Sequence, residues 1–175
     1  MRLPFAHLNL RRNPFGELDE SERAALAVVD VDAVAARLRA GARVQFVGDH
    51  GRGKTTHLLA LRARLPEARY CRRDRGQPLP DAPIVLVDEA DAVPRRACAL
   101  GVHVPFEGVE TISLPPLTSA RLAAICERRI EHVRRGPGAV PRVGNVDELI
   151  ARFRDDLRAI EGHLYEVFQQ WPSAS

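Results

Sequence analysis

Hydrophobic positions divide the chain into a front part with short apolar runs and a back part with helical spacing. "RVQFV" at 43–47 and "IVLVDEAD" at 84–91 contain apolar runs with the length and branched residues of a β-strand. The second run is apolar at four consecutive positions, which is typical of a central parallel strand buried on both faces. Between them, residues 55–65 follow the helical period, and Pro66 ends that helix.

The remaining segments are interpreted by the same rules. Residues 1–19 are expected to be an extended lead-in, because Pro4 and Pro14 discourage helix formation. The other expected elements of the front part are short helices between Ser21 and Gly41 and strands at 68–73, 99–104 and 109–114. In the back part we expect a helix from Thr118 or Ser119 to Gly136 and two helices between Asn145 and Trp171. These two helices are separated by a break near Asp155, which would cap the second of them.

This order of elements predicts an α/β fold with a C-terminal helical appendage. A strand, a glycine-rich loop and a helix come first, further strands follow, and only helices remain after them. We therefore expect a nucleotide-binding α/β core with a parallel sheet over residues 1–116, lead-in included, and a small helical lid subdomain over residues 117–175.

Composition and charge narrow the class of protein. The chain has 175 residues, 45% of them hydrophobic, which is enough for one domain with a real core. Its net charge of +3 supports nucleic-acid binding only weakly, and "RYCRRDRG" at 69–76 is as readily a solvated arginine loop. The three cysteines lack a CxxC pairing, and no signal peptide or membrane span is visible, so we expect a cytoplasmic protein.

One loop stands out because it holds the single lysine among 26 basic residues. The loop "GDHGRGKTT" fits the phosphate-binding pattern G-x-x-x-x-G-K-[ST], and a strand precedes it and a helix follows it, as that pattern requires. The residues predicted to bind the nucleotide here are Gly48, Asp49, His50, Gly51, Arg52, Gly53, Lys54, Thr55 and Thr56.

The chemistry of phosphate binding explains why lysine appears there. Glycines let successive N–H groups point at phosphate oxygens, and the positive end of the following helix adds to their attraction. Lys54 is expected to reach the β- and γ-phosphates as a compact charge, which also makes it a catalytic residue, while Thr55 offers a hydroxyl to Mg²⁺. Arginine, a larger planar group, fits such a cradle poorly.

The carboxylates that end the strand at 84–91 supply a second signal. If this strand neighbours the one before the loop, Asp88 lies beside the loop and is predicted to hold Mg²⁺. Glu89 is predicted to polarise a water for attack on the γ-phosphate. Asp91 is expected at the surface or as a cap. A solvated turn after an ordinary strand is the simpler alternative for both site carboxylates.

These two motifs carry a family resemblance. "GDHGRGKT" with "IVLVDE" resembles the P-loop ATPases that have an additional catalytic glutamate after the Mg²⁺-binding aspartate, and the helical tail resembles the AAA+ branch. "NPF" at 13–15 is similar to the lead-in of bacterial AAA+ proteins tied to secretion and transposition. The resemblance spans residues 8–171, but only the two Walker motifs are specific.

The resemblance implies ATP and Mg²⁺ as cofactors and adds candidate site residues. It implies a polar sensor after the fourth strand, for which His103 is the nearest candidate, and an arginine at the start of a lid helix, which Arg158 matches as a catalytic residue. It also implies that the lead-in residues Asn13, Pro14 and Phe15 wall the adenine, although a hydrophobic anchor would explain them equally.

One departure from the family bears on function. Residues 101–117 contain no arginine, where the family places an arginine finger; Arg95, Arg96 and Arg121 lie just outside this range. The leading hypothesis is therefore an Mg²⁺-ATP-binding ATPase module with slow hydrolysis that switches a protein partner or its own association. The alternatives are a nucleotide-gated binding protein without turnover and a small P-loop kinase; Glu89 favours attack by water over the latter.

Overall fold

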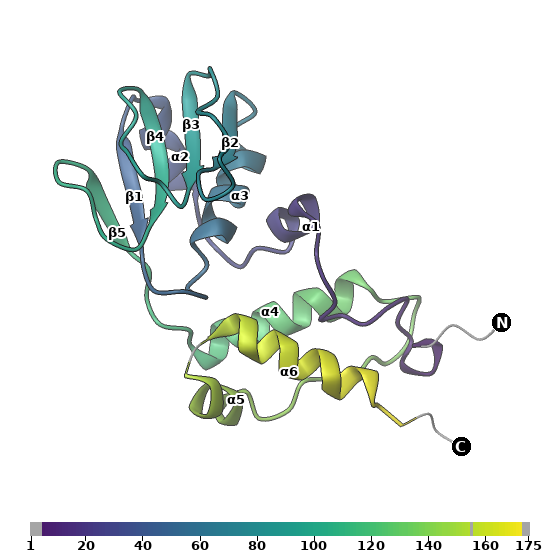
Figure 1. Ribbon diagram of the computed structural model, residues 1–175. Helices are drawn as coiled ribbons and strands as arrows, with labels where there is room; N and C mark the ends of the chain where they lie inside the picture. The colour runs from purple at the N-terminus through teal and green to yellow at the C-terminus, as the bar shows by residue number, and fades with distance from the viewer. Residues whose placement is uncertain (1–4, 155, 173–175) are drawn as a thin grey trace. The chain divides into compact units, whose positions relative to one another are not determined.

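A sheet of five parallel strands is the centre of this structure, a computed structural model that describes residues 5–154 and 156–172 (Figure 1). Neighbouring strands follow the order β2-β3-β4-β1-β5, and each adjacent pair is parallel. The strands are β1 (Arg43–Val47), β2 (Ala68–Arg72), β3 (Ile84–Asp88), β4 (Ala97–Val102) and β5 (Glu110–Ser113). The expected α/β fold with a parallel sheet is confirmed.

Alternating side chains of the strands build a core on each face of the sheet. On β3, Ile84 and Leu86 pack into a cluster with the helices α2 (Asp32–Arg39) and α3 (Lys54–Arg64), which cover one face (Figure 1). Val85 and Val87 point into a second cluster on the opposite face, packed with residues of loops. All five residues of β3 are buried, as the unbroken apolar run predicts.

The boundaries of β3 and β4 differ most from the prediction, while β2 is shorter by one residue at one end and β5 by one residue at each end. β4 ends at Val102, which pairs with Val47, the last residue of β1; beyond Val47 no partner is left, so the chain turns away at His103. β3 ends at Asp88 because Glu89 adopts φ +52°, a left-handed conformation that cannot continue a strand.

Three α-helices lie in the second compact unit of the chain. They are α4 (Ser119–His132), α5 (Val146–Phe153) and α6 (Leu157–Gln169). Each begins at a polar cap that accepts hydrogen bonds from backbone N–H groups of the first turn: Thr118 and Asn145, as predicted, and Asp156, which was not the predicted cap of α6. Asp155, the cap predicted for the last helix, lies outside the described residues.

The lead-in belongs to the helical unit. The chain divides into Asp19–Pro115 and a unit formed by Met1–Leu18 with Pro116–Ser175, whereas the sequence pattern assigned the lead-in to the α/β core. Leu8, Leu10 and Phe15 are buried in the core of the helices, and an antiparallel bridge joins Leu10 to Arg134. The lead-in also contains the short 3-10 helix η1 (Ala6–Leu8) and the unit around the sheet contains α1 (Glu20–Ala25).

Candidate functional site

The glycine-rich loop joins the end of β1 to the start of α3 at the carboxyl edge of the sheet. Gly51 has φ +80° and Gly53 has φ +90°, conformations that favour glycine, and Gly53 is the residue that caps α3. Asp49 and His50 are exposed, while Arg52 forms an ion pair with Asp49 at 3.5 Å. The loop is therefore a turn with its first polar side chains in solvent.

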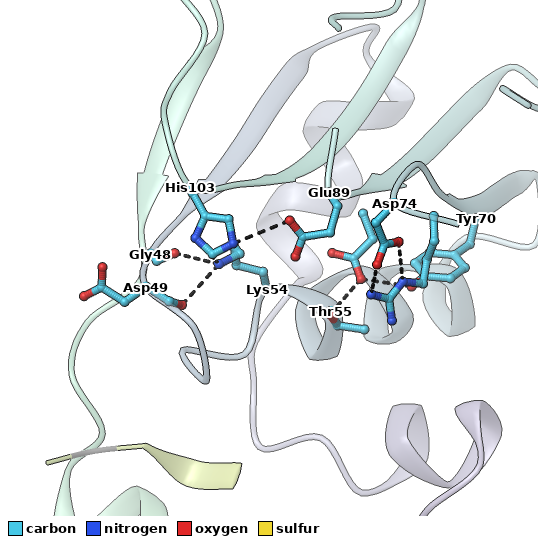
Figure 2. A network of polar contacts seen from close by, with 10 residues as sticks. Gly48, Asp49, Lys54, Thr55, Tyr70, Asp74, Glu89 and His103 are labelled. Atoms are coloured by element: carbon cyan, nitrogen blue, oxygen red, sulfur yellow. Dashed lines mark hydrogen bonds and ion pairs between the residues drawn. The ribbon is translucent and has the colours of Figure 1, made fainter. Parts of the chain in front are cut away.

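Lys54 is buried at the centre of this loop. Its side chain is 7% exposed, and Nζ donates hydrogen bonds to the carbonyl oxygens of Gly48 (2.6 Å) and Asp49 (3.1 Å) (Figure 2). Burial lowers the pKa of Lys54, and the carboxylates of Glu89, Asp88 and Asp49 oppose that shift. The loop thus holds one compact cation at the start of α3, and its predicted contact with the β- and γ-phosphates stays a prediction.

Asp88, at the end of β3, and Thr55, in the first turn of α3, meet although β3 and β1, the strand before the loop, are not neighbours. β4 lies between β1 and β3, so the adjacency on which the sequence argument for Asp88 depended is not found. Thr55 Oγ1 nevertheless donates a hydrogen bond of 2.7 Å to Asp88 Oδ2, because β4 contributes Gly101 beside Asp88. A Cβ at residue 101 would lie 2.8 Å from Asp88 Oδ1 and 3.4 Å from Lys54 Cβ. Only glycine leaves room for this contact.

These oxygens fit a magnesium ion. Asp88 is fully buried, and its Oδ1 has no hydrogen-bond partner among the described residues, which is costly for a carboxylate unless a ligand completes it. Hard oxygen donors are what Mg²⁺ prefers, and it commonly takes one or two protein ligands, with water and phosphate completing its shell. Within the described part of the chain, no three His, Cys, Asp or Glu side chains gather in a way that could hold a metal ion.

Glu89 and His103 complete the polar edge of the site. His103 Nδ1 lies 3.4 Å from Lys54 Nζ, and His103 Nε2 lies 3.4 Å from Glu89 Oε2 (Figure 2). The ring of His103 also contacts that of His50, with centroids 4.2 Å apart. Glu89 is held at positive φ, an uncommon backbone conformation for such a residue and one that clusters at functional sites.

The other predicted site residues have different surroundings. Thr56 is half-buried in the first turn of α3. Arg158 is exposed in the first turn of α6, in the helical unit. Its backbone N–H donates to the cap residue Asp156.

The three lead-in residues are tied into the helical unit. Asn13 Nδ2 donates to the Tyr165 carbonyl (2.9 Å), and the Pro14 carbonyl accepts from the buried Arg129 Nε (2.8 Å). The ring of Phe15 packs edge-on against Phe168, with centroids 5.2 Å apart. These contacts are those of an anchor for the lead-in, and the predicted role in holding adenine stays a prediction.

Sequence reasoning missed three residues that shape the site. Tyr70 of β2 donates a hydrogen bond to Asp88, and Gly101, which has no side chain, leaves room for the carboxylate of Asp88. Gln45 is fully buried on β1 and stabilises the loop that follows His103. Its amide donates hydrogen bonds to the carbonyls of Phe106 (2.9 Å) and Val109 (3.2 Å) in that loop. A polar residue inside the apolar run 43–47 was the visible signal for Gln45; Tyr70 and Gly101 gave none.

Comparisons with known proteins identify the fold. A solved structure of AMPPCP-bound DnaA from Aquifex aeolicus matches 89% of this chain and 63% of its own, with a TM-score of 0.56 and 14% identity. A crystal structure of a DNA replication initiation factor matches 86% of this chain and 62% of its own, with a TM-score of 0.51 and 13% identity. The chain thus spans less than two thirds of either neighbour, and what it shares with them is the fold, an α/β arrangement around a parallel sheet.

Sequence comparisons add no closer relative. No protein-family model matches the chain, and no curated protein does. Within the described residues, none of the helices has the length and apolar character needed to cross a membrane.

Proposed function

We propose that this chain is an Mg²⁺-dependent ATP-binding module of the AAA+ type, which hydrolyses ATP slowly and uses the nucleotide to switch a protein partner or its own association. Lys54 would bind the β- and γ-phosphates, together with the N–H groups of the loop from Gly48 to Gly53. Thr55 and Asp88 would hold Mg²⁺, which when bound neutralises the charge that develops on the phosphates. Glu89 would orient and deprotonate the attacking water.

One observation carries the proposal: a buried lysine and a buried, incompletely bonded carboxylate meet at the start of one helix. Lys54 and Asp88 are 7% and 0% exposed, and the hydrogen bond of 2.7 Å between Thr55 and Asp88 links them. Buried charges are expensive and need a reason. The fold shared with AMPPCP-bound DnaA supports a nucleotide as that reason, since AMPPCP is an ATP analogue.

His103 is placed to couple the phosphate-binding and hydrolytic groups. Because its two ring nitrogens lie 3.4 Å from Lys54 and from Glu89, it would sense the charge at the γ-phosphate position and orient the base. We further propose that Arg158 contributes to the nucleotide site, as the resemblance implies; its exposure on α6 supports its availability to a ligand.

A second candidate is a nucleotide-gated binding protein without useful turnover. It is favoured by the lack of any arginine in residues 101–117, because the transferring phosphoryl group then lacks an arginine finger from that segment. Both candidates share ATP binding and differ in hydrolysis. Phosphate release without an added acceptor would also exclude a kinase that waits for its acceptor.

Binding is tested with Lys54→Ala and Lys54→Arg, measured by calorimetric titration with ATP and Mg²⁺. We expect Lys54→Ala to lose at least about 100-fold in affinity, since it removes a charge-assisted contact to phosphate, and Lys54→Arg to be nearly as weak because the guanidinium does not fit between the loop carbonyls. Wild-type affinity in Lys54→Ala would overturn the proposal.

Hydrolysis is tested with Glu89→Gln, which keeps the size of the side chain and removes the base. We expect phosphate release to fall about 100-fold or more while ATP affinity is unchanged, since general-base catalysis contributes roughly that much. Equal release by Glu89→Gln and the wild type would favour the binding protein without turnover.

A further inference from the structure

Two hydroxyl groups donate to one oxygen of Asp88. Thr55 Oγ1 lies 2.7 Å from Asp88 Oδ2, and Tyr70 Oη lies 3.1 Å from the same oxygen. Thr55 comes from the phosphate-binding loop, whereas Tyr70 comes from β2, the strand on the far side of β3 (Figure 2). The other oxygen, Oδ1, faces Gly101 and has no hydrogen-bond partner within the described residues. In the described part of the structure, hydrogen bonds therefore hold the carboxylate through Oδ2 alone.

Tyr70 is itself held firmly. It pairs with Leu86 in the parallel register of β2 and β3, which fixes its backbone. The guanidinium of Arg62, on α3, lies over its ring at 5.8 Å from the centroid, and Arg62 forms an ion pair of 2.7 Å with Glu20.

We propose that Tyr70 is a positioning residue of the magnesium site: its hydroxyl holds Asp88 in the orientation in which the carboxylate, together with Thr55, receives the ion. This inference rests on the proposed function. Without the Tyr70 hydroxyl, Thr55 is the single remaining donor to Asp88 among the described residues, and the carboxylate can rotate about its terminal torsion. Partners that orient a metal ligand commonly change metal affinity by about 10- to 100-fold when they are removed.

The role predicts an effect on the metal and none on the phosphates. Tyr70 contacts no residue of the loop in the hydrogen bonds described, and it reaches the site only through Asp88. Nucleotide binding in the absence of Mg²⁺ depends on Lys54 and the loop, so it should not need Tyr70. A purely structural tyrosine would instead lower both kinds of binding together.

The experiment titrates Mg²⁺ into the full chain with ATP and records ATP affinity at each concentration. It compares the wild type, Tyr70→Phe, and Tyr165→Phe as a matched control, because the chain has two tyrosines and Tyr165 is exposed on α6. In Tyr70→Phe we expect the Mg²⁺ midpoint to rise about 10-fold or more with Mg²⁺-free affinity unchanged. Tyr165→Phe should match the wild type in both quantities.

Three outcomes would overturn the inference, and they separate it from the proposed function. A wild-type Mg²⁺ midpoint in Tyr70→Phe would remove the positioning role and leave the proposed function intact. The phenyl ring preserves the packing against Arg62. A loss of Mg²⁺-free binding in the same variant would therefore show that the hydroxyl supports the structure of the whole site and not the metal ligand alone. If the wild type binds no ATP at any Mg²⁺ concentration, the proposed function fails, and the inference fails with it.

Discussion

The two units of this chain both bury polar side chains, but they use them differently. In the helical unit, Asn13 and Arg129 direct their nitrogens at backbone carbonyls and at Glu161, so the polar groups hold the lead-in in place. In the α/β unit, Lys54 and Asp88 gather at the edge of the sheet. Among the buried polar residues described (Asn13, Gln45, Lys54, Asp88 and Arg129), Asp88 alone has an atom without a hydrogen-bond partner.

That difference separates polar groups that stabilise a fold from groups that wait for a ligand. A buried polar group whose partners all come from the chain helps to hold the fold, and its removal lowers the stability of the unit. A buried carboxylate oxygen left incomplete carries a desolvation cost that a water, an ion or another ligand relieves. Substitutions in the helical unit should therefore change stability, and substitutions around Asp88 should change binding.

The largest expected effect is that of Arg129→Met in the helical unit. Arg129 donates to the carbonyls of Pro14 and Gly16 and pairs with Glu161 at 2.5 Å, so its loss leaves buried acceptors and a carboxylate unpaired. We expect the free energy of unfolding to fall by roughly 3–5 kcal/mol. Urea denaturation followed by the fluorescence of Trp171, the one tryptophan, reports on this unit.

The control for this variant is Arg135→Met, an exposed arginine in the same unit, which should change the stability by about 0.5 kcal/mol or less. If Arg129→Met changed the stability no more than this control, the hydrogen bonds and the ion pair of Arg129 would not stabilise the helical unit.

Gly101→Ala should have an intermediate effect, in the other unit. The added methyl would lie 2.8 Å from Asp88 Oδ1 and 3.2 Å from Leu58 Cδ1, in a packed core. We expect a loss of roughly 1–3 kcal/mol in stability, measured by thermal unfolding, together with weaker Mg²⁺-dependent ATP binding because Asp88 is displaced.

Gly162→Ala provides the matched control for Gly101→Ala. Gly162 lies inside α6, and a Cβ there meets nothing within 4 Å, so alanine should stabilise that helix by about 0.5–1 kcal/mol. Opposite signs for the two glycines are the expected result; equal effects would mean that Gly101 is an ordinary strand glycine.

The smallest effect is expected for Asn13→Ala. The variant loses the hydrogen bond to the Tyr165 carbonyl and the one that Phe15 N–H donates to Asn13 Oδ1, so we expect about 1 kcal/mol less stability. ATP affinity, measured by calorimetry, should not change if Asn13 only anchors the lead-in. A fall in ATP affinity without a stability change would instead support the predicted adenine wall and weaken the comparison of the two units.

Local signals in the sequence were enough to predict the fold and the residues of the loop. The apolar runs and the helix caps depend on neighbours in the chain, which is why β1 at 43–47 and the cap Asn145 were predicted correctly. The position of β4 between β1 and β3 depends on pairing over long distances, and no local pattern reports it. Gly101 and Tyr70 were missed for the same reason, since both act through Asp88 across neighbouring strands.

The most direct test of the central claim is the Mg²⁺ dependence of ATP binding in Asp88→Asn. The claim is that the incomplete carboxylate of Asp88 exists to hold a nucleotide-bound magnesium ion. We predict that ATP affinity in the wild type rises with Mg²⁺, and that Asp88→Asn keeps the Mg²⁺-free affinity but loses the increase. An equal increase in the variant and the wild type would contradict the claim.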